Sequence, residues 1–75
     1  MPKFEVRVWL STPDKVESFR QEGGAYYELP PEQVRLLTTE ASNDEHARVK
    51  IERMLEDTWE VPQSNFEIVD VRRLN

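Results

Sequence analysis

The sequence predicts a small α+β domain with the element order strand, helix, strand, strand, helix, strand. Two observations carry most of this prediction: a strictly alternating segment from Lys3 to Leu10, and an amphipathic helical segment that starts at Ser42. A length of 75 residues allows a single domain over 1–75 with one small core. A deep pocket would consume much of that core, so an enzyme built around a large cavity is disfavoured.

The first strand is expected over Lys3 to Leu10. Successive side chains of a strand point to opposite faces of the sheet. Four apolar side chains therefore share one face: Phe4, Val6, Val8 and Leu10. Trp9 is the exception, because it lies on the otherwise polar face together with Arg7.

A short helix is expected next, over residues 13–22, with a structured loop as the alternative. The pair Thr12-Pro13 suits a helix start, with threonine as the cap and proline in the first turn. Val16 and Phe19 are three residues apart and would face the core. Gly23-Gly24 would end the helix, since glycine adopts the left-handed conformation at little cost.

The middle of the chain is expected to supply two strands. Residues 25–29 are rich in aromatic side chains, and Pro30-Pro31 ends that segment because proline cannot donate to a ladder. The run from Gln33 to Ala41 fits both strand and helix spacing. A strand is favoured there, because the run ends in Thr38-Thr39 shortly before the next helix begins.

The long helix is expected to begin at Ser42 and to end at Trp59 or Glu60. Ser42 and Glu45 have the spacing of a capping box, and Val61-Pro62 stops the helix. An inward stripe recurs at spacings of three and four along it: Ala47, Ile51, Met54, Leu55 and Thr58.

The last strand, Asn65 to Leu74, changes phase half way along. Phe66 and Ile68 share one face, whereas Val69 and Val71 share the other. A β-bulge would turn both sets inward. Without a bulge, the strand is apolar on both faces.

These six elements follow the ferredoxin-like βαββαβ order, in which helices cover one face of the sheet and leave the other open. A three-stranded antiparallel sheet packed by one long helix is the plainer alternative. Either architecture hosts many unrelated activities, so function must be argued from surfaces and side chains.

Composition narrows the classes of function. The chain has no cysteine, no apolar run long enough for a membrane span and no hydrophobic segment at its N-terminus. A cytoplasmic protein is therefore expected, in the host cytoplasm if the protein is viral. The net charge of −5 argues against direct nucleic-acid binding, which depends on clustered lysine and arginine.

No catalytic, metal or cofactor residue is expected. His46 is the only histidine, and the consecutive residues Asp44-Glu45-His46 would point in different directions on a helix. Gly23-Gly24 lacks the lysine that follows in a phosphate-binding loop. We therefore expect a protein that is not an enzyme and carries no cofactor.

The first candidate contact surface is the open sheet face, with Arg7, Trp9, Val69 and Val71. Tryptophan and arginine are enriched at interface hot spots, and exposed apolar patches often mark association sites. A non-catalytic, regulatory protein–protein interaction is the leading expectation, and the partner is another protein or a second copy that forms a homodimer. A bulge in the last strand, or a loop carrying Tyr26 and Tyr27, would instead cover this patch.

The second candidate surface is an acidic ridge on the long helix, formed by Glu45, Glu52 and Glu56 with Val49 among them. It fits a basic partner, and the alternative function is an acidic, phage-encoded inhibitor that occupies or mimics a nucleic-acid site. Against this, three i,i+4 pairs would partly neutralise the ridge: Asp44–Arg48, Arg48–Glu52 and Arg53–Asp57.

Overall fold

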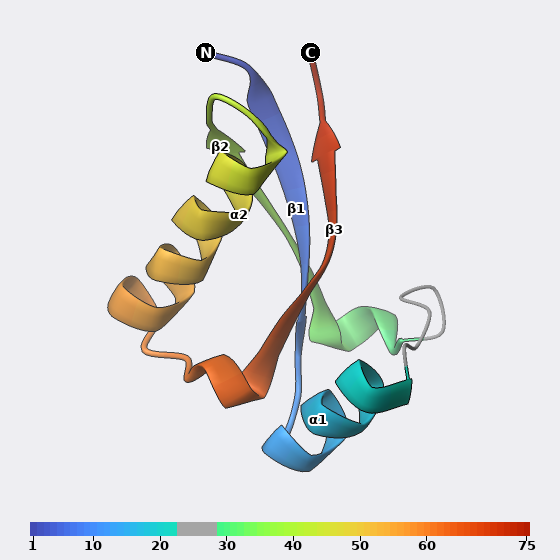
Figure 1. Cartoon of the computed structure of the whole chain (residues 1–75). Helices are drawn as coiled ribbons and strands as arrows, with labels where there is room; N and C mark the ends of the chain where they lie inside the picture. The colour runs from blue at the N-terminus through green and yellow to red at the C-terminus, as the bar shows by residue number, and fades with distance from the viewer. Residues whose placement is uncertain (23–28) are drawn as a thin grey trace.

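The computed structural model describes residues 1–22 and 29–75 of the chain. Its sheet has three antiparallel strands in the order β2-β1-β3 (Figure 1). They are β1 (Lys3–Leu10), β2 (Val34–Glu40) and β3 (Phe66–Arg73). The predicted α+β class is confirmed, and the order of the elements is consistent with the ferredoxin-like arrangement.

The strands agree closely with the expected ones. β1 has the predicted bounds, and β2 shows that the ambiguous run 33–41 is extended. The further strand expected at 25–29 falls, except for Leu29, outside the described residues. Within the part of the chain that is described, β1 therefore lies between the other two strands and pairs with both.

Helices precede β2 and connect it to β3. The first, α1 (Pro13–Glu22), confirms a helix where a loop was the alternative. The second, α2 (Asp44–Arg53), continues into the π-helical turn η3 (Met54–Thr58). Single 3-10 turns, η2 (Pro31–Gln33) and η4 (Gln63–Asn65), lead into β2 and β3. None of the helices described has the length and apolar character needed to cross a membrane.

The main core lies between the sheet and α2, which runs along one side of it (Figure 1). The predicted alternation of β1 supplies three buried side chains to this core, and the helical stripe supplies three more. The buried residues of the cluster are Phe4, Val6, Val8, Ala41, Ala47, Ile51, Leu55, Phe66 and Ile68. Burial of apolar surface of this kind is the main favourable contribution to folding.

A β-bulge explains the change of phase in β3. Arg7 pairs with Asp70 and the next residue, Val8, pairs with Ile68, which leaves Val69 as the extra residue. The bulge brings Val71 level with Val6, so Val71 packs against the same core as Ile68. Of the two alternatives left open by the sequence, the bulged strand is the one that forms.

The start of α2 differs from the expected capping box by one residue. Asn43, not Ser42, is the N-cap, and its Oδ1 accepts a 2.8 Å hydrogen bond from the backbone N–H of His46. The backbone N–H of Ser42 donates in turn to His46 Nδ1 at 3.1 Å. The histidine ring thus accepts a hydrogen bond from the residue before the cap, whereas the glutamate of a capping box accepts one from the cap residue itself. Asn43 is as good a cap as serine.

At the end of the long helix, the backbone hydrogen bonds span five or six residues instead of the usual four, which widens the last turn. The N–H of Trp59 donates to the carbonyl of Met54 at 3.1 Å, and that of Val61 donates to the carbonyl of Leu55 at 2.9 Å. Glu60, between them, adopts a left-handed conformation with φ 57°. This is the position that glycine favours at a helix C-terminus, so the chain holds a glutamate there at a steric cost.

Candidate functional site

The face of the sheet away from α2 is uncovered over much of its area. Side chains that alternate with the core residues occupy it, because neighbours along a strand point to opposite sides. The strand register sorts them into two rows. Glu5 pairs with Arg72 on one side and Thr38 on the other, and Arg7 pairs with Asp70 and Leu36.

The charged members of the two rows form ion pairs across β1 and β3. Arg72 Nη2 lies 3.2 Å from Glu5 Oε1, and Arg7 Nε lies 3.9 Å from Asp70 Oδ2. The order of charges is reversed between the rows. In the Glu5 row the β1 residue is negative and the β3 residue is positive, whereas in the Arg7 row the β1 residue is positive and the β3 residue is negative. We call Glu5, Arg72, Arg7 and Asp70 the charge checkerboard. It sums to zero, although the whole chain carries −5.

Leu36 is the apolar member of this surface. It is 57% exposed, whereas its neighbour Leu37 packs against the core on the other side of the sheet. Four large apolar side chains stand out as exposed among the described residues, and Leu36 is the one that belongs to a strand. A leucine held out to solvent beside Arg7 on a hydrogen-bonded sheet is a rigid point of contact.

One end of this face is closed by α1. Trp9 is only 4% exposed, its ring centroid lies 5.1 Å from that of Phe19, and its Nε1 donates to Gln33 Oε1 at 3.0 Å. Val16 of α1 is fully buried, yet neither it nor Trp9 belongs to the core cluster under α2. The two helices therefore pack on opposite faces of the sheet. The element order is as expected, but the expectation that both helices cover one face is wrong, because α1 folds over the Trp9 end of the other face.

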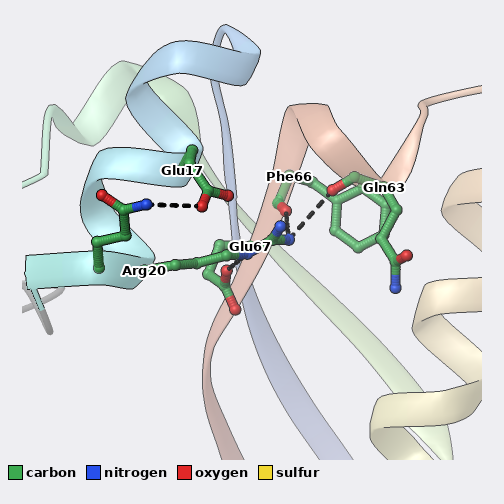
Figure 2. A network of polar contacts seen from close by, with 6 residues as sticks. Glu17, Arg20, Gln63, Phe66 and Glu67 are labelled. Carbon is green, nitrogen blue, oxygen red and sulfur yellow. Dashed lines mark hydrogen bonds and ion pairs between the residues drawn. The ribbon is translucent and has the colours of Figure 1, made fainter.

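Arg20 fastens α1 to the sheet (Figure 2). Its Nη2 donates to the carbonyl oxygens of Gln63 and Phe66, each at 3.1 Å, and its Nε forms an ion pair with Glu67. Glu67 lies beside Trp9 in the strand register. Sequence reasoning missed this contact, because Arg20 and Glu67 are 47 residues apart and neither belongs to a recognisable motif.

The structure separates the four residues expected on the open face. Arg7 lies on it, and Val69 is the half-buried residue of the bulge. The expected exposure of Trp9 is wrong, because α1 folds over it, and Val71 does not face out, because the bulge turns it to the core. The segment that covers Trp9 is α1. Tyr26 and Tyr27, which were expected as the alternative cover, lie outside the described residues.

The acidic ridge is present on α2 and η3. Glu45 and Glu56 are exposed, and Glu52 and Val49 are half-buried. The neutralising pairs expected along the helix do not form: the ion pairs found within the described residues are Arg7–Asp70, Arg20–Glu67 and Arg72–Glu5. The ridge carboxylates thus have no cation within 4.0 Å in that part of the chain.

Two hollows lie on the surface formed by the described residues. One, of about 330 Å³, lies beside Trp9 and α1, and another, of about 360 Å³, lies between the start of α2 and the end of β3. No polar or charged side chain is buried in the described residues, and no three potential metal ligands gather there. His46 contacts Ser42 and bonds no carboxylate of residues 1–22 or 29–75. Acid–base catalysis needs such convergent groups.

Comparison of the chain with protein-family models, with curated proteins and with solved structures finds no match. The fold and the surface by themselves define a small α+β protein. Its three-stranded sheet packs α2 on one face. The other face presents the charge checkerboard and Leu36 beside α1.

Proposed function

We propose that this protein works by binding another protein through the open sheet face, and that it catalyses no reaction. The observation that carries the proposal is the exposure of Leu36 directly beside Arg7, on the part of this face that α1 leaves uncovered. Arginine and large apolar side chains supply much of the binding energy of protein interfaces. Because hydrogen-bonded strands hold both residues, little conformational entropy is lost when a partner binds.

A second function is favoured by a separate observation, the absence of the expected ion pairs along α2 within the described residues. We propose as the alternative that Glu45, Glu52 and Glu56 bind a basic protein surface and so inhibit a nucleic-acid-handling complex. Such binding would weaken steeply as ionic strength rises, whereas binding through Leu36 would respond little.

Site-specific photo-crosslinking tests both proposals. A benzophenone amino acid is placed at Leu36 on the open face, at Glu56 on the ridge or at Lys15 on the exposed side of α1 as the control, and the protein is irradiated in the cells that produce it. Covalent protein adducts at Leu36 that are absent at Lys15 support the proposed function. Adducts at Glu56 alone overturn it in favour of the alternative, and equal adducts at all positions overturn both.

A further inference from the structure

The arrangement of charges in the checkerboard is complementary to that of a second copy of the same face. Its two rows are two residues apart along β1, or about 7 Å. Each row holds one positive and one negative side chain, and the order of signs reverses from the Glu5 row to the Arg7 row. A second copy of this face, turned over so that its Glu5 row lies on the Arg7 row of the first copy, therefore places opposite charges against each other.

A two-fold axis produces this exchange. The axis lies between two stacked faces, at right angles to the strands and midway between the rows. Glu5 then faces Arg7 of the second copy, and Arg72 faces Asp70 of the second copy. Each contact occurs twice, and none joins like charges. Leu36 meets Thr38 of the second copy, so the exposed leucine is covered as well.

Other placements fit less well. An axis moved along the strands onto the Glu5 row sets Glu5 against its own copy, and an axis on the Arg7 row sets Arg7 against its own copy. Both juxtapose like charges, which costs energy and disfavours those registers. An axis parallel to the strands, between β1 and β3, matches charges too, but it leaves Leu36 of β2 beyond the edge of the second copy.

We propose that the open face binds a second copy of this chain, in an isologous dimer about the axis between the two rows. This inference rests on the proposed function and names its partner. The checkerboard is neutral whereas the remainder of the chain carries the net charge of −5, so two acidic copies meet there without local net repulsion. A strongly basic protein would gain nothing from a neutral face and would be drawn to the acidic ridge.

The contact is small, because three strands and two rows take part and α1 occupies the end at Trp9. Interfaces below about 1,200 Å² in total are typical of weak and reversible association. We therefore expect a dimer whose population rises with concentration over the micromolar range, with a mass between one and two chains at intermediate concentration.

Two charge-exchange variants test the symmetry. The first is Glu5→Arg with Arg72→Glu, and the second is Arg7→Glu with Asp70→Arg. Each keeps an opposite-charge pair across β1 and β3, so the fold and the net charge are retained. Each also gives both rows the same order of signs. Like charges then face each other across the proposed axis, and either variant alone is expected to be monomeric.

An equimolar mixture of the two variants restores opposite charges at every facing position. Analytical ultracentrifugation at up to several hundred micromolar is expected to show a dimer for the wild type, monomers for each variant alone and a heterodimer for the mixture. Circular dichroism confirms that the variants are folded. A monomeric wild type overturns the proposal, and so does a variant that still dimerises alone, as the parallel axis would allow.

The outcomes separate this inference from the function on which it rests. If the wild type is monomeric but Leu36 crosslinks to a different protein, the open face is a binding surface and the second copy is the wrong partner. If Leu36 crosslinks to nothing beyond the Lys15 control and the wild type is monomeric, both proposals fail.

Discussion

Trp9 and Gln33 are joined by a 3.0 Å hydrogen bond from the indole Nε1 to the amide Oε1, which connects β1 to the last residue of η2, immediately before β2. Phe19 packs on the same indole ring with its plane tilted by 54°. Trp9 thus links the first strand to α1 and to the entry of β2. Its position under α1, instead of on the open face, distinguishes this structure most clearly from the expectation.

The two tryptophans should report opposite environments. Trp9 is 4% exposed and Trp59 is 43% exposed. We expect the fluorescence of the Trp59→Phe variant, which retains Trp9, to be blue-shifted and poorly quenched by acrylamide. The Trp9→Phe variant should be red-shifted, readily quenched and less stable by about 1–3 kcal/mol, because it loses buried area and the bond to Gln33. Equal quenching of the two variants would show that α1 does not cover Trp9.

Removal of the Arg20 side chain should loosen α1. Arg20→Ala loses hydrogen bonds to the carbonyls of Gln63 and Phe66 and the ion pair with Glu67. Its side chain is 39% exposed, so solvent screening reduces the effect, and we expect a loss of about 1–2 kcal/mol in urea unfolding. Gln21→Ala is the matched control. Among the described residues, Gln21 bonds Glu17 on the same helix and no other side chain, so its loss should cost under about 0.5 kcal/mol.

Deletion of Val69 should be tolerated. Without this residue, Ile68 still pairs with Val8 and Asp70 with Arg7, and β3 regains regular alternation. Deletion of Val71 is the control, because it moves Arg72 into the half-buried, core-facing position beside Val6 and should destabilise the domain strongly. Thermal melting followed by circular dichroism compares them. A Val69 deletion as damaging as the Val71 deletion would contradict the register described.

Glu60→Gly should stabilise the protein. The left-handed backbone of Glu60 costs roughly 1–2 kcal/mol for a residue with a Cβ, and glycine gives part of this back through its more flexible unfolded state. We expect a net gain of about 0.5–1 kcal/mol in urea unfolding. Glu56→Gly, inside the helical turn, should lose about 1 kcal/mol. A loss of stability on Glu60→Gly would mean that the glutamate side chain has a stabilising role.

The periodicity of apolar residues predicted the bounds of individual strands and helices and the faces that they bury. The alternation of β1 correctly indicates its bounds and its buried face, and the spacing of Ile51 and Leu55 correctly indicates the face of the long helix that is buried. The predicted N-cap was wrong by one residue, because Ser42 and Asn43 are nearly equivalent as caps.

The candidate surface was less predictable. Arg7 could be placed from alternation alone, but the exposure of Trp9 depends on which face α1 covers, and helical spacing does not encode that choice. Leu36 was missed for a related reason. The run that contains it fitted both helix and strand spacing, so the side on which Leu36 lies became evident only with the register opposite Arg7.

Because β1 is the central strand of the sheet, its two edges are paired at different times during synthesis. This strand precedes both of its partners in the chain, and the partner at its other edge, β3, is made after everything else described. A nascent chain that stops short of Phe66 holds β1 with one edge unpaired and lacks the side chains that cover Val8. Unpaired edges of this kind recruit other chains, so chains truncated before Phe66 are expected to be the form most prone to aggregate.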